Sequence, residues 1–282
     1  MAALPQDLGP HRFTVSDPLD GRLDDYRELK DATRRRSGTF IAESERVIVR
    51  LFNSPFETRS LLLTPARYAR LEHLIPPSVE VFVSSEEVIN HVVGFPLHRG
   101  AVALGIRPQE SRSNGGAEYG VDLRSARVIV VVEDVVDPDN VGAVFRHSAA
   151  FGVDAVLLSP SAGDPLYRKA LRAAVGWSLQ VPWARLPSQR WPAALSDLRE
   201  DGWNVLALTP SEDALVLPAT LAGLRADARV ALLVGTEHDG LTNGAMSNAD
   251  LLTRIPMAPG VDSLNVATTV AIALYELAKR TW

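Results

Sequence analysis

The strongest constraint on the fold is a series of five apolar runs in the second half of the chain. They consist mainly of Val, Leu and Ala with little polar alternation, which is typical of strands buried on both faces of a parallel sheet. Segments with helical periodicity fill the intervals, so we predict an α/β fold with a largely parallel sheet. The predicted strands are 127–133, 154–159, 203–209, 229–235 and 251–257, and the predicted helices are roughly 141–151, 165–175, 188–200 and 264–280.

A weaker series of the same kind occupies the first half and predicts a second α/β unit, also with a largely parallel sheet. Its predicted strands are 60–64, 79–83 and 101–106, and its predicted helices are 41–53, 65–74 and 85–93. The stretch between the halves is polar and rich in Gly and Ser, as linkers are. We therefore predict a flexible arm (1–17), a first domain (18–107), a linker (108–125) and a second domain (126–282).

Composition excludes several classes of protein. The 282 residues contain no cysteine, which removes disulfides, iron–sulfur clusters, thiolate zinc sites and a cysteine nucleophile. The six histidines are scattered without metal-ligand spacing, so we expect no tightly bound metal. No apolar run reaches the ~18 residues of a membrane span, and the N-terminus lacks the layout of a signal peptide. We expect a cytoplasmic protein.

The formal net charge of −5 is unfavourable for binding nucleic acid, so the distribution of basic residues matters more than their sum. Segment 27–36, RELKDATRRR, holds five basic residues, and a second basic cluster lies at 168–172. A solvated helix face is the alternative explanation for such runs. The candidates for contact with a polyanion are Lys30, Arg34, Arg35, Arg36, Arg168 and Arg172.

Segment 134–152, DVVDPDNVGAVFRHSAAFG, combines a turn, a helix and two residues that helix formation does not explain. Asn140 follows the turn-forming Asp-Pro-Asp and stands where an N-cap is expected. Gly142 in the first turn costs up to ~1 kcal/mol relative to alanine, so we expect a close approach to the backbone there. Arg146 lies beside the apolar stripe of the helix, where it forms either a surface ion pair or part of a site.

Segment 232–250, LLVGTEHDGLTNGAMSNAD, is a buried strand followed by a Gly-rich loop and a short helix. In open parallel sheets, ligands bind beyond the carboxyl ends of the strands. Gly235 would let a ligand approach the backbone there, and Glu237 places a charge at the same edge. The alternative for Glu237 is a capping acid in an ordinary connection.

Segment 255–279 ends in an apolar helix that belongs to the core. Ser263 and Asn265 precede this helix, on either side of Leu264. One of the two could cap the helix, but two small polar residues exceed what capping requires. The fingerprints GxGxxG, GxxxxGK[ST] and GxSxG are all absent, which disfavours dinucleotide enzymes, NTPases with a phosphate-binding loop and α/β-hydrolases.

In order and spacing, these three segments resemble the three motifs of the SpoU (TrmH) family of RNA 2′-O-methyltransferases, within the SPOUT superfamily. The resemblance covers residues 127–282 and rests on Asn-x-Gly-xxx-Arg, Gly-x-Glu-xx-Gly-Leu and Ile-Pro-Met…Ser-Leu-Asn-Val. Segment 37–65 is similar to the family's N-terminal substrate-binding domain, a small α/β module like certain RNA-binding ribosomal proteins. Two positions depart from the pattern, since His238 and Ser44 stand where many members have glycine.

The resemblance implies that the second domain is trefoil-knotted and that its loops hold S-adenosylmethionine, largely through backbone groups. It also implies a homodimer through the knotted domain, with Arg146 acting within one protomer or across the interface. The basic candidates would then bind RNA. The positions that match the family's cofactor-binding loops are Leu208, Thr209, Gly235, Ile255, Met257 and Leu264.

The reaction that the resemblance implies is methyl transfer to a ribose 2′-hydroxyl, with Arg146 as the family's proposed catalytic arginine. A guanidinium with a pKa above ~12 is a weak base, so we expect Arg146 to stabilise the developing alkoxide with the help of a nearby phosphate. Asn140, Glu237, Ser263 and Asn265 would position this arginine and the nucleotide.

Three alternatives remain open. A non-catalytic RNA-binding protein would keep the fold but would be expected to lose motif residues, and these are all present. A SPOUT enzyme that methylates a base atom lacks the Asn-x-Gly-xxx-Arg motif. The complete N-terminal domain favours ribosomal RNA as the substrate, while tRNA is the alternative.

Overall fold

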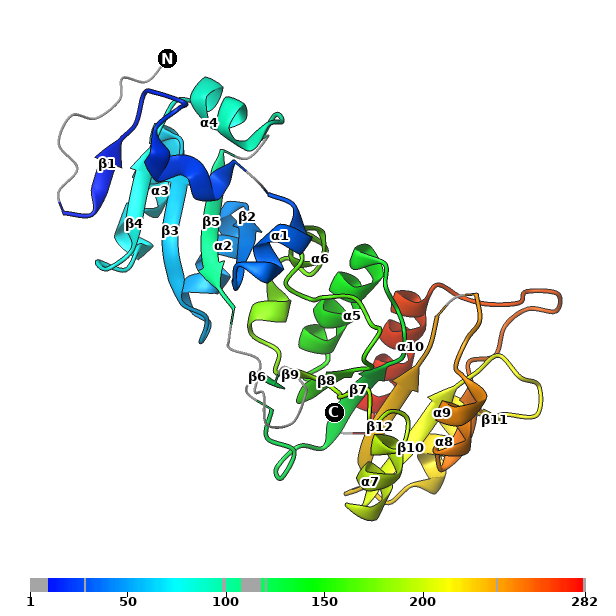
Figure 1. The fold of residues 1–282 in the computed structure, drawn as a ribbon. Helices are drawn as coiled ribbons and strands as arrows, with labels where there is room; N and C mark the ends of the chain where they lie inside the picture. The colour runs from blue at the N-terminus through cyan, green and yellow to red at the C-terminus, as the bar shows by residue number, and fades with distance from the viewer. Residues whose placement is uncertain are drawn as a thin grey trace. The chain divides into compact units, whose positions relative to one another are not determined.

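The computed structural model describes residues 10–27, 29–97, 100–107, 118–119, 121–236 and 238–280. The chain divides into two compact units. The first comprises Met1–Gln109 and Leu166–Gln180, and the second comprises Glu110–Pro165 and Val181–Trp282. Both units are α/β, as predicted (Figure 1). Among the described residues, no helix has the length and hydropathy that crossing a membrane requires.

The first unit contains a five-stranded sheet of mixed direction. Its strand order is β1–β4–β3–β5–β2, and β5 runs antiparallel to both of its neighbours while the other pairs are parallel. The prediction of a largely parallel sheet was therefore wrong for this unit, because alternation of helix and strand does not fix strand direction. The strands are β1 (Arg12–Thr14), β2 (Thr39–Glu43), β3 (Thr58–Leu63), β4 (Glu80–Val83) and β5 (Ala101–Ile106).

One predicted helix of this unit begins later than expected. The apolar periodicity over 41–53 was assigned to one helix, but its first residues belong to β2, and α2 (Glu45–Phe52) begins after Ser44. Ser44 has a φ of +90°, so the backbone breaks between strand and helix at this residue. The other helical segments are η1 (Gly21–Tyr26), α1 (Asp31–Arg36), α3 (Pro65–Leu71), η2 (Glu72–Leu74) and α4 (Glu86–Val93).

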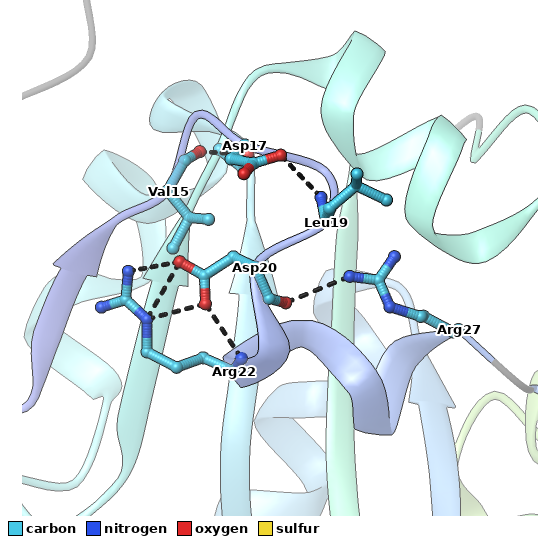
Figure 2. A network of polar contacts seen from close by, with 7 residues as sticks. Val15, Asp17, Leu19, Asp20, Arg22 and Arg27 are labelled. Carbon is cyan, nitrogen blue, oxygen red and sulfur yellow. Dashed lines mark hydrogen bonds and ion pairs between the residues drawn. The ribbon is translucent and has the colours of Figure 1, made fainter.

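The beginning of the described chain is ordered by a small polar network (Figure 2). Asp20 caps η1 by accepting a hydrogen bond from the Arg22 backbone N–H at 2.9 Å, and its carboxylate also pairs with the Arg22 guanidinium. These bonds lower the pKa of Asp20 to about 2. Arg27 donates to the Asp20 carbonyl at 3.1 Å. Residues 12–14, assigned to an arm from the sequence, form the edge strand β1 because they pair with β4.

Segment Leu166–Gln180 packs with the first unit, although the predicted domain boundary placed it in the second. It contains α6 (Arg168–Ala173) and η3 (Trp177–Leu179). Asp31 accepts a hydrogen bond from the Arg168 backbone N–H at 2.9 Å, and the Arg50 guanidinium lies 4.1 Å from the centre of a Trp177 ring. Arg50 also donates to the Val175 carbonyl. These contacts join α6 and η3 to α1 and α2.

The second unit contains an eight-stranded sheet with the order β11–β13–β10–β12–β7–β8–β9–β6. All neighbouring strands are parallel except β6 and β9. The five predicted strands are all present, and the three additional ones are only two or three residues long. The strands are β6 (Glu118–Tyr119), β7 (Val128–Val132), β8 (Ala155–Leu158), β9 (Trp183–Arg185), β10 (Trp203–Leu208), β11 (Leu215–Val216), β12 (Arg229–Val234) and β13 (Leu251–Arg254).

Helices cover both faces of this sheet. On one face, Leu195 and Leu198 of α7 (Ala194–Glu200) and Ala245 of α9 (Asn243–Ser247) share a buried apolar cluster with residues of the central strands. On the other side, α5 (Pro138–Ala150) lies alongside α10 (Val266–Ala278), as Figure 1 shows. The additional helix α8 (Leu217–Gly223) follows β11 and was not predicted. This layering leaves the carboxyl ends of β10, β12 and β13 to form one edge with their loops.

Candidate functional site

A cavity of about 340 Å³ lies at the carboxyl edge of the second sheet. Most of its lining comes from three segments: the end of β10 with the residues that follow it, the loop that follows β12, and the stretch from β13 into the first turn of α10. All six predicted cofactor-binding residues contribute to the lining, namely Leu208, Thr209, Gly235, Ile255, Met257 and Leu264. Residues from separate motifs therefore meet at one pocket.

The loop after β12 closes on itself. Thr236 and Gly240 form an antiparallel backbone bridge, and Gly240 adopts a φ of +66°. A Cβ at Gly235 would lie 2.3 Å from the Gly240 carbonyl oxygen, so position 235 must be glycine for the loop to close. We expected Gly235 to admit a ligand to the backbone, and the structure shows that the loop itself makes the close approach. Glu237 lies outside the described residues.

Helix α5 of the first motif begins about one turn earlier than predicted. Asp137 is the N-cap of α5, and its side chain accepts hydrogen bonds from the backbone N–H groups of Asp139 and Asn140. Pro138 occupies the first helical position, where the missing N–H has no cost. The assignment of Asn140 as N-cap was therefore wrong, and its side chain makes a different contact. Gly142 is buried, while Gly152 adopts the left-handed conformation expected after the helix.

Asn140 and Asn265 connect the first and third motifs. Asn265 Nδ2 donates a hydrogen bond of 2.8 Å to Asn140 Oδ1. Asn265 is also the N-cap of α10, because its Oδ1 accepts from the Ala267 N–H at 2.9 Å and the Thr268 N–H at 3.2 Å. The neighbouring Ser263 lines the cavity. The start of α5 and the cavity-lining stretch before α10 are thus directly linked.

Arg146 lies on the exposed side of α5, two turns after its N-cap. The adjacent His147 is partly buried, and its pKa is lowered below the ordinary value by burial first and by the charge of Arg146 second. A permanently charged guanidinium on an exposed helix face can donate hydrogen bonds to an anionic oxygen or a phosphate, but it is a poor proton acceptor.

Glu133, directly after β7, was not among the candidate residues. It is 1% exposed, and its carboxylate accepts hydrogen bonds from Trp191 and from the backbone and side chain of Thr242. Its position at the carboxyl end of a buried strand was the available signal, since a charged residue there follows five branched apolar residues.

A second residue that sequence analysis missed is Arg185, at the end of β9. Its guanidinium donates to the carbonyls of Ser159, Pro160, Ala162 and Gly163 at 2.6–3.2 Å. Arg185 therefore organises the loop after β8. Nothing in the sequence pattern distinguishes it from an ordinary surface arginine.

The predicted basic residues of the first unit separate into three groups. Lys30, Arg35 and Arg36 are exposed. Arg34 is only 6% exposed and lies 3.4 Å from Asp25, so its charge is directed into the protein. The last group, Arg168 and Arg172, faces a single buried carboxylate.

That carboxylate is Glu43. Its Oε2 lies 3.7 Å from Arg168 and 3.2 Å from Arg172. The Arg168 guanidinium also lies 4.6 Å from the centre of the Phe95 ring. Among the described residues, no group of three or more His, Asp or Glu side chains is placed to hold a metal ion.

The fold is that of known RNA methyltransferases. An AdoMet-bound rRNA methyltransferase from Sinorhizobium meliloti superposes with a TM-score of 0.78 at 22% identity, covering 96% of this chain and 98% of that one. The SpoU methyltransferase AviRb from Streptomyces viridochromogenes, in complex with AdoMet, gives a TM-score of 0.74 at 22% identity, covering 93% and 98%. These likenesses establish the fold.

Sequence similarity then establishes the family. The model of the SpoU rRNA Methylase family matches residues 127–275. An "uncharacterized tRNA/rRNA methyltransferase" of Mycobacterium tuberculosis is 40% identical over 268 residues, covering 93% of this chain and 90% of that protein. The 23S rRNA (guanosine(2553)-2′-O)-methyltransferase RlmP of Bacillus subtilis is 25% identical over 257 residues, covering 91% and 95%. The chain therefore belongs to the SpoU rRNA methylase family, as its motifs predicted, and is an RNA methyltransferase of that family.

Proposed function

We propose that this protein transfers a methyl group from S-adenosylmethionine to a ribose 2′-hydroxyl of ribosomal RNA, and that it does so in the cytoplasm. One observation carries the proposal: the six residues expected to bind the cofactor line a single cavity, and the Asn140–Asn265 hydrogen bond ties the start of the arginine-bearing helix α5 to that cavity's wall. The two AdoMet-bound structures of the same fold agree with this choice of cofactor.

The cavity suits S-adenosylmethionine in volume and in chemistry. Its volume of about 340 Å³ falls in the range of roughly 300–1,000 Å³ that is usual for small-molecule sites. Leu208, Ile255 and Met257 supply apolar surface for a nucleoside. Asp239 and Asp262 add two carboxylates to the lining, which suits a ligand that carries sulfonium and ammonium groups.

We assign each motif residue a separate role in the methyl transfer. When bound, S-adenosylmethionine supplies an electrophilic methyl group. Arg146 stabilises the negative charge that develops on the ribose oxygen, with a backbone phosphate of the RNA as its second partner. Asn140 and Asn265 hold the entrances of α5 and α10 together, and Ser263 and Glu237 complete the positioning of the nucleotide. The 2′-hydroxyl proton leaves to solvent or to the phosphate, because the guanidinium cannot accept it.

We also propose that the second unit is trefoil-knotted and forms a homodimer. The family resemblance supports both statements, and the meeting at one cavity of loops from β10, β12 and β13 agrees with the knot. Val136 in the first motif is 64% exposed and Val261 in the third motif is 48% exposed, which suits coverage by a second copy. An active monomer in analytical ultracentrifugation would contradict this part of the proposal.

Ribosomal RNA is the proposed substrate, and tRNA is the second candidate. RlmP of Bacillus subtilis, which matches nearly the full chain, is named as a 23S rRNA enzyme. The name of the Mycobacterium tuberculosis relative includes both RNA classes. Incubation with each purified RNA class separately distinguishes the two substrates.

Substitution of Arg146 tests the proposed chemistry. Arg146→Ala should lower turnover on the order of 10²–10³-fold, while the affinity for S-adenosylmethionine, measured by calorimetry, stays close to that of wild type. Arg225→Ala is the matched control, because Arg225 is an exposed arginine of the same unit that lines no part of the cavity. Turnover of Arg146→Ala near the wild-type value would remove this residue from the mechanism. Absence of turnover in the wild type on any RNA would favour the non-catalytic alternative.

A further inference from the structure

Glu133 contacts both ends of the cavity-lining loop 235–241. Its backbone N–H donates to the carbonyl of Val234 at 2.8 Å, directly before the loop. Its Oε2 accepts a hydrogen bond of 2.8 Å from the backbone N–H of Thr242, directly after the loop. One residue of β7's carboxyl end therefore closes the base of the loop that carries Gly235, Gly240 and Leu241 into the cavity.

In the part of the chain that the structure describes, three groups form hydrogen bonds to the Glu133 carboxylate, and all three are donors. Besides the Thr242 N–H, the Trp191 Nε1–H lies 3.1 Å from Oε1, and the Thr242 hydroxyl lies 2.8 Å from the same oxygen. The Thr242 hydroxyl oxygen accepts the Ala245 N–H at 3.1 Å, so its own proton points at Glu133. Both carboxylate oxygens must therefore be acceptors, a requirement that an ionised carboxylate meets and an amide does not.

Burial makes this arrangement specific. At 1% exposure, the carboxylate exchanges its hydration for these three donors, and a donor left without an acceptor at this depth would be strongly unfavourable. The loop closes on itself through the Thr236–Gly240 bridge, and Leu241 at its end packs into the buried apolar cluster of the second unit. The bonds from Glu133 join the two residues that flank the closed loop, Val234 and Thr242, to the end of β7.

We propose that Glu133 is a positioning residue for cofactor binding, which fixes loop 235–241 through two acceptor oxygens. The proposal rests on the proposed function, because it takes the cavity as the S-adenosylmethionine site. Glu133 lines no part of the cavity and acts through Thr242 and the loop.

The isosteric variant Glu133→Gln tests the need for two acceptors. Its side-chain NH2 group must face either the Thr242 N–H or the Trp191 Nε1–H, so one donor opposes another. The orientation toward Trp191 disturbs the loop less, because the Gln oxygen still accepts from the Thr242 N–H and the Thr242 hydroxyl can accept from the Gln NH2 group. Removal of the opposing donor in the double variant Glu133→Gln, Trp191→Phe should therefore restore part of the missing function, and this rescue is not expected of a general structural defect.

Two measurements on the full chain report the effect. Calorimetry should give affinities for S-adenosylmethionine and S-adenosylhomocysteine that are roughly tenfold weaker in Glu133→Gln, a free-energy difference of about 1.4 kcal/mol, and stronger again in the double variant. Amide hydrogen exchange without ligand should be faster at Thr242 in Glu133→Gln. The control Val156→Ala, in the buried centre of β8, should lower stability. In the folded protein it should change neither the ligand affinity nor the hydrogen exchange of the Thr242 amide.

The outcomes separate this inference from the proposed function. A wild-type protein that binds neither ligand contradicts the proposed function, while the exchange of the Thr242 amide still tests whether Glu133 fixes the loop. Unchanged affinity and unchanged Thr242 exchange in Glu133→Gln overturn the inference, even where the variant is less stable. Should Glu133→Gln not fold, Thr242→Val, which removes the hydroxyl bond, replaces it, and wild-type affinity in that variant overturns the inference.

Discussion

The side-chain amide of Asn265 donates to the side-chain oxygen Oδ1 of Asn140 across 125 positions of sequence, with a donor–acceptor distance of 2.8 Å. The same Asn265 side chain caps α10 through its oxygen, so its orientation is determined at both ends. This one residue both begins a core helix and joins the third motif to the first. Stability and activity should therefore respond differently to different substitutions at position 265.

Asn265→Ala should lower the free energy of unfolding by about 1 kcal/mol, because α10 loses its cap. Asn265→Asp keeps an acceptor for the Ala267 and Thr268 N–H groups and adds a negative charge that the helix N-terminus favours. It loses the donor to Asn140, so we expect near-wild-type stability and lower methyl transfer. Denaturant unfolding and a methyl-transfer assay on the same samples compare the two. Equal stability in both variants would contradict the capping role.

Gly235→Ala should disrupt the loop after β12, because its Cβ would lie 2.3 Å from the Gly240 carbonyl oxygen and 2.5 Å from the carbonyl carbon. Relief requires a backbone shift, with a cost of about 1–3 kcal/mol, and we expect S-adenosylmethionine affinity to fall with it. Gly223→Ala, at the end of α8 with no atom within 4 Å of the new Cβ, is the matched control. Calorimetry measures the affinity of Gly235→Ala for S-adenosylmethionine. A wild-type affinity would contradict the prediction, because it would show that the loop tolerates the backbone shift.

His147 should make stability depend on pH. Its folded-state pKa lies below the ordinary value of 6.5, through burial and the charge of Arg146. At a pH between the folded-state pKa and the unfolded-state pKa, His147 is protonated in the unfolded chain but not in the folded chain. Unfolding therefore becomes more favourable as the pH falls through this range. The free energy of unfolding should therefore fall as the pH is lowered through 6.5, and by less in His147→Gln. Parallel curves for the two proteins would refute this contribution.

The basic residues near α1 should affect RNA binding unequally. Lys30, Arg35 and Arg36 are exposed, so their joint replacement by Gln should weaken binding and reduce the salt slope by about 0.7–0.9 for each RNA phosphate that the variant no longer neutralises. Arg34 is buried against Asp25, and Arg34→Gln should chiefly lower stability. Filter binding over a series of salt concentrations measures the slopes. An unchanged slope in the triple variant would assign these three residues to a solvated helix face.

The strands of the second unit were predicted well, because a strand buried on both faces consists almost entirely of consecutive apolar residues. All five apolar runs of this kind are strands. The first unit was harder. Ile41 is fully buried in β2, but its apolar neighbours in α2 continue the helical periodicity, so strand and helix merged into one prediction. The antiparallel direction of β5 has no signature in its residues.

Candidate residues could be predicted where they occupy a position in a sequence motif. They could not be predicted where their role depends on which distant residues pack against them. The lining of the cavity by Gly235, Met257 and Leu264 follows positions that the family motifs specify. The burial of Arg34 within a run of three arginines does not, because the run itself suggests an exposed face. Glu133 was missed for the same reason, since its partners Trp191 and Thr242 come from distant parts of the chain.

The central claim is methyl transfer to a ribose oxygen, and nucleoside mass spectrometry tests it most directly. Ribosomal RNA from cells that lack this gene is incubated with the protein and S-adenosylmethionine carrying an isotopically labelled methyl group, then digested completely to nucleosides. The account predicts label in a 2′-O-methylated nucleoside, and its disappearance with Arg146→Ala. Label found only on a base, or no label in any RNA class, would contradict it.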